Sequence, residues 1–269
     1  MNNETLSLRQ EEYIREHRRH HRLVAFLRFL LFFLFAALWE ISADLHWIDA
    51  FIFSSPSRIV MTIADMSRDC TIFRHTGITL YETLLSFALV ILVSFAAATV
   101  LWFSGTISEI LEPWLVILNS LPKSALAPLL IVWLGANTGT IIVAGMSVAV
   151  FGSIISMYTA FRETDEEKIK LICTLGGNRL QVLRCVVIPS SIPSIISILK
   201  VNIGLCLVGV IIGEFLAARE GLGYLIIYAS QIFKLNYLIT ALIILCAIAF
   251  GLYQIIQKLE HRIRKARSL

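Results

Sequence analysis

Polar residues inside otherwise apolar runs are the positions at which this sequence could do chemistry. Lys123 lies in the run 114–134 and Glu214 in the run 192–216. A lysine at the centre of a bilayer costs about 2.5–3.5 kcal/mol, so its ammonium group should face a helix bundle or a wet cavity. There it would attract an anionic solute. The alternative is a lysine that snorkels to the membrane surface or pairs with a buried carboxylate.

Glu214 also has two open roles. It lies toward the outer end of its run, where it would either line an external gate or form hydrogen bonds within a subunit interface. We assign Lys123, Asn119 and Glu214 to a candidate path for a solute across the membrane.

No catalytic constellation is present in the sequence. The patterns HExxH, GxSxG and GxxxxGK[ST] are absent, so a zinc hydrolase, a serine hydrolase and a P-loop ATPase are not expected. A membrane enzyme would need paired acidic or histidine residues at one membrane level, whereas Glu40, Glu82 and Glu214 are single and far apart in the sequence. We therefore expect no catalytic residue and no cofactor, and ATP hydrolysis would have to come from a partner.

Neither the cysteines nor the histidines are spaced like metal ligands. The five cysteines form no CxxC pair, and we expect them to act as small apolar residues. The histidines of the N-terminal segment fit a basic arm near anionic lipid. We predict no metal site.

The composition places the chain in a membrane. Hydrophobic residues make up 57% and charged residues 16% of the 269 residues, and the mean hydropathy is +0.79. A soluble domain carries about a quarter charged residues. A hydrocarbon core of about 30 Å is crossed by about 20 apolar residues in a helix. We predict an all-α membrane protein with six transmembrane helices, at 23–41, 78–103, 114–134, 138–161, 192–216 and 237–256.

Basic residues indicate the orientation. They crowd both ends of the chain, and the positive-inside rule places both ends in the cytoplasm, which requires an even number of spans. We predict a cytoplasmic basic arm at 1–22, a transmembrane domain at 23–257 and a cytoplasmic basic tail at 258–269. The protein would be multi-pass in the plasma (inner) membrane, with the loop 162–190 on the cytoplasmic side.

The charged loop 162–190 is predicted to begin with a short helix. Thr164 followed by Glu167 has the spacing of a capping box, and the acidic residues of the first turn favour a helix start. The pair Gly176-Gly177 predicts the helix end. Ile169, Ile172 and Leu175 would form an apolar stripe along it.

A second short helix is predicted directly afterwards. Asn178 can cap a helix over 179–187, which Pro189 would terminate. The apolar stripe of the first helix has two open uses: it rests on the ends of the chain's own spans, or it enters a groove on another protein.

The remaining signals concern packing outside the loop. Ile59, Ile63 and Met66 fall at helical spacing, which predicts an external helix lying on the membrane surface or packed on the bundle. Gly209 and Gly213 form a GxxxG pair that favours close helix contact. Gly221-Leu-Gly223 is predicted to be a turn rather than a phosphate cradle, because no strand precedes it.

Four segments resemble one family. Leu175-Gly176-Gly177 with the downstream Val186-x-Ile188-Pro189 resembles the cytoplasmic EAA loop of ABC-importer permeases. The segments LNSLPKSALAPLLIVWLG and VIIGEFLAAREGLGYLI resemble the third-span and post-fifth-span signatures of the nitrate/sulfonate/taurine-type inner-membrane component, and the Ser-Pro segment near residue 55 resembles the one before its core. On these residues, roughly 54–225, the chain is identified as a member of this family.

The resemblance implies a type I ABC importer permease fold with a cytoplasmic coupling helix that docks onto an ATPase. The positions that name the EAA motif fall on Lys170, Leu171 and Ile172, so its glutamate and alanines are missing, although Glu166 and Glu167 lie one turn earlier. The implied coupling residues are Glu166, Glu167, Lys170, Leu171, Ile172, Leu175, Gly176, Gly177 and Pro189.

The resemblance also implies partners. These are a cytoplasmic ABC ATPase dimer, an extracytoplasmic solute-binding protein and a second permease chain, expected to be an identical copy, with lipid around them and no nucleic acid. The solute would be nitrate-, sulfonate- or taurine-like, or a heterocyclic vitamin precursor. The alternatives are a secondary transporter, which would show repeated halves, and a polytopic membrane enzyme.

Overall fold

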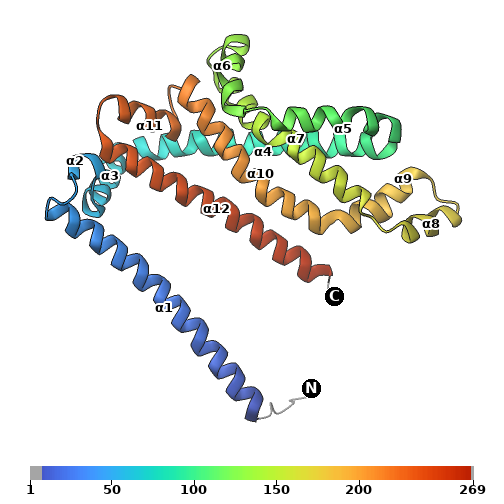
Figure 1. Ribbon diagram of the computed structural model, residues 1–269, viewed down its shortest axis with the longest axis horizontal. Coiled ribbons are helices and arrows are strands. Elements are labelled where there is room, and N and C mark those ends of the chain that lie inside the picture. The colour runs from blue at the N-terminus through green and yellow to red at the C-terminus, as the bar shows by residue number, and fades with distance from the viewer. Residues whose placement is uncertain (1–7, 268–269) are drawn as a thin grey trace. The chain divides into compact units, whose positions relative to one another are not determined.

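The structure is a computed structural model that describes residues 8–267 (Figure 1). The described part consists of helices and connecting turns, with no strand. The outermost residues of the predicted arm and tail, 1–7 and 268–269, lie outside it. The chain divides into two compact units, one up to Thr62 and one from Ile63 onward.

The first unit holds a long helix and a short one. They are α1 (Leu8–Asp44) and α2 (Ala50–Phe53), and the unit boundary falls inside α3 (Pro56–Arg68). The start of α3 is tied to α1 within this unit. The backbone N–H and the hydroxyl of Ser57 donate to the two carboxylate oxygens of Glu40 at 2.9 and 2.6 Å.

The second unit contains the remaining helices. Its elements are α4 (Thr71–Phe103), α5 (Gly105–Ser120), α6 (Lys123–Leu134), α7 (Thr138–Arg162), α8 (Glu166–Thr174), α9 (Arg179–Val182), the π-helical turn η1 (Leu183–Val187), α10 (Ile188–Ala217), α11 (Leu222–Gln231) and α12 (Leu235–Arg267). Figure 1 shows α8 and α9 at one end of α10 and α11 at its other end.

The described residues contain five to six candidate membrane spans, against the six predicted. Continuous helices of sufficient length and hydropathy cover Phe26–Asp44, Thr71–Phe103, Thr138–Arg162, Arg179–Ala217 and Leu235–Ile263. A bent pair, α5 and α6, meets at 95° and makes the sixth span if the two helices are counted as one.

The prediction of a continuous third span over 114–134 is therefore wrong. Leu121 adopts an extended conformation, with φ −62° and ψ 140°. Proline disfavours the helical conformation in the residue before it and has no N–H to donate. Pro122 therefore breaks the helix, and Lys123 begins a new one.

The core of the second unit is built around α7, which packs against both α4 and α10. The GxxxG pair on α10 provides the close approach. A Cβ atom built on Gly209 would lie 2.8 Å from the Cα of Gly145 and 2.9 Å from the carbonyl oxygen of Ala144, and one built on Gly213 would lie 3.1 Å from the Cα of Ile141. The predicted small-residue contact is confirmed.

Replacing Gly209 with alanine should destabilise the bundle, because the new methyl group would press against backbone atoms of α7 that cannot move aside. We expect a loss of about 1–3 kcal/mol, typical of overpacking, seen as a lower melting temperature of the detergent-solubilised protein. The matched control is Gly204→Ala on the same helix, where a Cβ would meet nothing within 4 Å. Equal melting temperatures for the two variants would contradict the assigned helix contact.

The helix predicted from Ile59, Ile63 and Met66 is α3. Within the second unit, the side chains of Ile63 and Met66 pack into a cluster with Leu222 and Leu225 of α11 and Leu245 of α12. The C-terminal half of α3 is therefore packed on the bundle, one of the two positions that its amphipathic pattern allows.

Candidate functional site

The helix α8 begins one residue later than the capping pattern predicts. Its N-cap is Asp165, whose carboxylate accepts a hydrogen bond from the backbone N–H of Glu167 at 2.9 Å. Thr164 is buried, and its hydroxyl lies 3.2 Å from the hydroxyl of Ser190. The prediction that Thr164 is the cap is wrong because its hydroxyl is engaged by α10, which leaves the neighbouring carboxylate to cap the helix.

The end of α8 follows the predicted glycine pattern. Gly176 has φ +82°, a conformation that favours glycine. The backbone N–H groups of Gly176 and Gly177 donate to the carbonyl oxygens of Cys173 and Ile172 at 3.0 and 2.9 Å. This is a Schellman motif, so both glycines shape the turn that ends α8.

The second short helix is capped as predicted but does not end as predicted. The side chains of Asn178 and Gln181 each accept the other's backbone N–H, at 2.9 and 2.8 Å, and form a capping box. Pro189 lies in the first turn of α10 instead of ending the helix. The π turn η1 precedes it, and proline is tolerated in the first turn of a helix because the N–H groups there have no partner within the helix. The short helix therefore continues directly into a membrane span.

The predicted apolar stripe is divided between two environments. Ile169 and Ile172 are half-buried and pack against the core cluster that contains Phe161. Leu175 and Leu171 are 75% and 58% exposed. The two uses left open by the sequence therefore apply to different faces: the isoleucines rest on the chain's own helices, and the leucines remain uncovered.

The surroundings of the exposed leucines are polar and hollowed. Glu166, Glu167 and Lys170 are exposed, and the ammonium group of Lys170 lies 3.4 Å from the carboxylate of Glu166. A hollow of about 250 Å³ lies at the α8–α9 turn, lined by Ile172, Leu175, Gly176, Gly177, Gln181 and Cys185. Sequence reasoning did not single out Leu180, which is 62% exposed on α9.

Lys123 and Asn119 lie together at the break between α5 and α6. The ammonium group of Lys123 donates to the backbone carbonyl of Asn119. That carbonyl is among the last four of α5, which lack partners within the helix, and a cation is favourable at a helix C-terminus. Among the side chains that the structure describes, no carboxylate pairs with Lys123. The sequence missed this capping role because it treated the span as unbroken.

Glu214 is buried, with a side chain 1% exposed. One carboxylate oxygen accepts a hydrogen bond from the hydroxyl of Thr79 at 2.6 Å, and the other accepts from the backbone N–H of Gly223 at 2.5 Å. Of the two roles that the sequence left open, the structure shows hydrogen bonding, and it occurs within the chain.

The same network holds the start of α11. The N–H of Leu222 donates to the hydroxyl of Thr79 at 2.8 Å, and the N–H of Gly221 donates to the ring nitrogen of His75 at 2.9 Å. These backbone donors at a helix N-terminus have no partner within the helix. Gly221 has φ +111°, which confirms the predicted turn. Side chains of α4 and α10 therefore anchor α11.

Glu82 lies beside Glu214, contrary to expectation. Its side chain is 1% exposed, and its carboxyl group is close enough to that of Glu214 for the two to interact. The sequence treated them as single because they are far apart along the chain. The structure brings them together because α4 and α10 both pack against α7.

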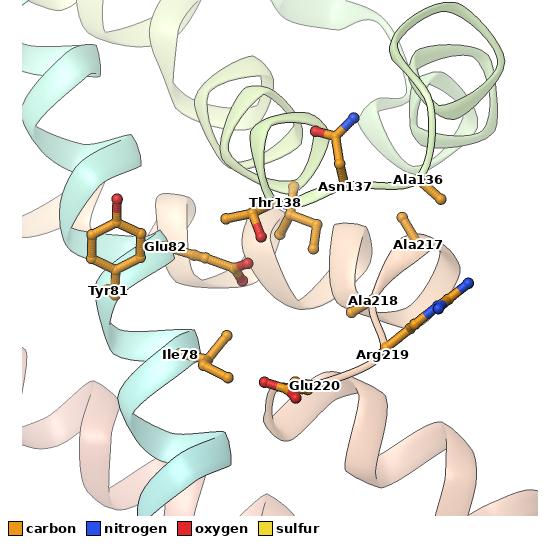
Figure 2. Close-up of a pocket in the computed structure, with 11 residues that line it drawn as sticks. Ile78, Tyr81, Glu82, Ala136, Asn137, Thr138, Ala217, Ala218, Arg219 and Glu220 are labelled. Carbon is orange, nitrogen blue, oxygen red and sulfur yellow. The ribbon is translucent and has the colours of Figure 1, made fainter.

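A cavity of about 460 Å³ opens beside Glu82, between the start of α4, the start of α7 and the end of α10 (Figure 2). Figure 2 shows the Glu82 side chain extending from α4 toward the other two helices. Its polar lining residues are Tyr81, Glu82, Asn137, Thr138, Arg219 and Glu220. Glu214, Lys123 and Asn119 are not among the lining residues, so the three predicted path residues do not form one site in this chain.

Most of the chain matches one known protein family. The family described as "Binding-protein-dependent transport system inner membrane component" matches residues 90–265, which is more than half of the chain. The chain belongs to this family. It is the permease subunit of an ABC importer, and the ATPase is a separate subunit.

Relatives agree with this assignment. A probable ABC transporter permease protein of Haemophilus influenzae is 32% identical over 228 residues, which cover 84% of this permease and 91% of the relative. The formylaminopyrimidine transport permease protein ThiX of Halalkalibacterium halodurans is 28% identical and covers 72% and 77% of the two chains. The taurine transport system permease protein TauC of Escherichia coli is 24% identical and covers 84% of each.

The fold is also similar to that of a solved ABC transporter chain. A chain of the methionine ABC transporter MetNI, in an inward-facing conformation, aligns with a TM-score of 0.63 at 18% identity, over 73% of this permease and 95% of that chain. The predicted type I importer permease fold is confirmed. The protein is a multi-pass inner-membrane subunit, and its family implies an ATPase and a solute-binding protein as partners. The secondary transporter and the membrane enzyme are excluded by the family assignment.

Proposed function

We propose that two copies of this permease form the path of a small solute, and that the α8–α9 segment receives a cytoplasmic ATPase dimer below them. The solute is of the kinds named for the relatives, a pyrimidine-type heterocycle or a sulfonate such as taurine, delivered by a solute-binding protein on the outer face. One observation carries the docking proposal: exposed leucines on a short helix that is capped at both ends and that leads, through α9, into a membrane span.

The exposed leucines are suited to a partner's groove. An apolar helix face that the chain itself leaves uncovered gains free energy when a second protein buries it. Leu171, Leu175 and Leu180 provide this face. Glu166, Glu167 and Lys170 would form a polar rim around it, and Ile172, Gly176, Gly177 and Pro189 would hold the segment in shape.

The segment is also connected so that it can transmit motion. From Arg179 the helix runs without interruption to Ala217. The guanidinium group of Arg179 donates to the carbonyl oxygen of Phe103, the last residue of α4, at 2.9 Å. A displacement of the segment by the ATPases would therefore move α10 directly and α4 through this hydrogen bond.

The proposed path runs past the break between α5 and α6. Non-helical backbone at membrane depth is tolerated only where protein covers it or where it lines a water-filled cavity. Leu121 and Pro122 are exposed in the single chain, so a second copy or the aqueous path must cover them. Lys123 and Asn119 lie at this point, and we assign Glu214 an indirect role as the anchor of α11.

We also propose that both ends of the chain, including the arm 1–22 and the tail 258–269, are cytoplasmic, with the transmembrane domain 23–257 between them. Native cysteines test this orientation. Cys70 precedes α4 and Cys173 lies in α8, and both are exposed. In variants that keep one of them, an impermeant maleimide should label Cys70 in intact cells and Cys173 only after the membrane is opened.

The buried Cys206 serves as the control, since it should remain unlabelled until the protein is denatured. Labelling of Cys173 in intact cells would reverse the orientation and remove the α8–α9 segment from the side where ATP is available.

A further inference from the structure

We propose that the cavity beside Glu82 receives the hydrogen-bond-donating end of the transported solute, an amine or a ring N–H, and that Glu82 accepts this hydrogen bond. The inference rests on the proposed function, because it concerns a solute that this permease passes. It selects among the solutes left open above: it favours solutes that carry N–H groups over bare oxyanions.

One oxygen of the buried Glu82 carboxyl group lacks a donor. Its side chain is 1% exposed, and its Oε2 atom has no hydrogen-bond donor among the described residues. A buried polar atom without a partner is costly, and more so when it is charged. Glu82 also lines the cavity, and its side chain extends into the space between α4, α7 and α10 (Figure 2). Rotation of the carboxylate would bring Oε2 within reach of a donor in the cavity.

The chain itself offers Glu82 only one alternative. Two carboxyl groups hydrogen bond to each other only when a proton lies between them, so the neighbouring Glu214 could satisfy Glu82 only if one of the two were protonated. Both oxygens of Glu214 already accept hydrogen bonds, from Thr79 and from Gly223. A donor on the solute satisfies Glu82 from the cavity side without that shared proton.

The other charged groups of the cavity lie at the end of α10. Glu220 is paired with Arg74 of α4. Arg219 is exposed and has no ion-pair partner in residues 8–267. The cavity therefore has a hydrogen-bond acceptor, Glu82, and an exposed cation, Arg219. An N–H group of a solute can donate to Glu82, and an acidic group, where the solute has one, can pair with Arg219. A bare oxyanion would lie beside a carboxyl group that offers it no donor.

The size of the cavity is consistent with this occupant. At about 460 Å³, it falls in the range of small-molecule sites, about 300–1,000 Å³. A single aromatic ring or a short amino acid fits within such a volume.

The test is protection of a cysteine in the cavity wall. Ala218→Cys is introduced into a permease whose native cysteines are replaced, and the permease–ATPase complex is reconstituted in nanodiscs. Labelling by a maleimide is followed with two matched pairs of probes: 4-aminopyrimidine against 4-methylpyrimidine, and taurine against ethanesulfonate. In at least one pair the N–H-bearing member should protect the cysteine at concentrations about tenfold lower than its partner, as expected for the loss of a hydrogen bond to a charged group.

Glu82→Gln should reduce the difference within that pair, whereas Glu109→Gln, the same change at an exposed position on α5, should leave it intact. Equal protection by both members of each pair, or no protection by any probe, would overturn the inference. The probe comparison needs no change at Glu82, so it decides even if Glu82→Gln fails to assemble. Failure of the proposed function would show separately, as a complex from which the ATPase is missing.

Discussion

Leu175→Asp should release the ATPase and abolish ATP-driven uptake while the permease remains folded. Leu175 is 75% exposed in the single chain, so the substitution removes little packing within the permease. In the docked complex, the new carboxylate would be buried in an apolar groove, which costs several kcal/mol when it is unpaired. A loss of about 3 kcal/mol weakens binding more than a hundredfold. The measurements are co-purification of the ATPase and uptake in proteoliposomes.

Two further variants separate the loss of docking from a general effect of charge or of misfolding. Cys173→Asp places the same charge at an exposed position on a different face of α8 and should retain the ATPase. Ile172→Asp should instead lower the yield of folded permease, because Ile172 packs against the core cluster of Phe161. If Leu175→Asp and Cys173→Asp both keep the ATPase and full uptake, the leucine face is not the docking surface.

Glu214→Ala should be among the most destabilising single changes in this permease. It removes the acceptors of Thr79 and of the Gly223 N–H, and it leaves a void beside Glu82. Buried polar groups left without partners cost about 1–3 kcal/mol each. We expect a loss of about 3–5 kcal/mol in total, which is enough to lose most of the folded protein, since domains are stable by only about 5–15 kcal/mol.

The measurements are the yield of monodisperse protein and its melting temperature. Glu214→Gln should be milder, because its amide oxygen still accepts one of the two hydrogen bonds. The control is Glu109→Ala, which removes an exposed carboxylate from α5. A Glu214→Ala protein as stable as the control would show that the network does not anchor α11.

The sequence predicts what depends on local pattern and on hydropathy. The spans are long apolar runs, and helix α8 is closed by two glycines whose role follows from their backbone freedom. The capping box at Asn178 and the close contact at Gly209 likewise depend on residues whose chemistry permits few alternatives. These features are visible without knowing which helices are neighbours.

The corrected predictions have local causes in some cases and competing partners in others. Thr164 has the capping pattern, but Ser190 engages its hydroxyl, and Asp165 caps the helix. Pro189 has the pattern of a helix end, but the π turn before it keeps the helix continuous. The run 114–134 has the pattern of one span, but the extended Leu121 and Pro122 divide it between α5 and α6.

Glu82 and Glu214 show most clearly that contacts between distant helices cannot be predicted from the sequence pattern. Each is a single carboxylate in its own apolar run, and only the shared packing of α4 and α10 on α7 brings them together. A similar limit applies to the apolar stripe of α8. Helical spacing places Ile172 and Leu175 on one face, but only the packed structure shows that the first is covered and the second is free.

Site-specific photo-crosslinking at Leu175 tests most directly whether this permease recruits its ATPase through the α8–α9 segment. A photoreactive amino acid replaces Leu175 in cells that make the whole transporter, and the membranes are irradiated. The expected adduct contains the ATP-binding subunit, and the same probe at Phe73, which is 66% exposed at the opposite end of the bundle, should not capture it. Adducts at Leu175 that contain only lipid or a second permease chain would contradict the docking role.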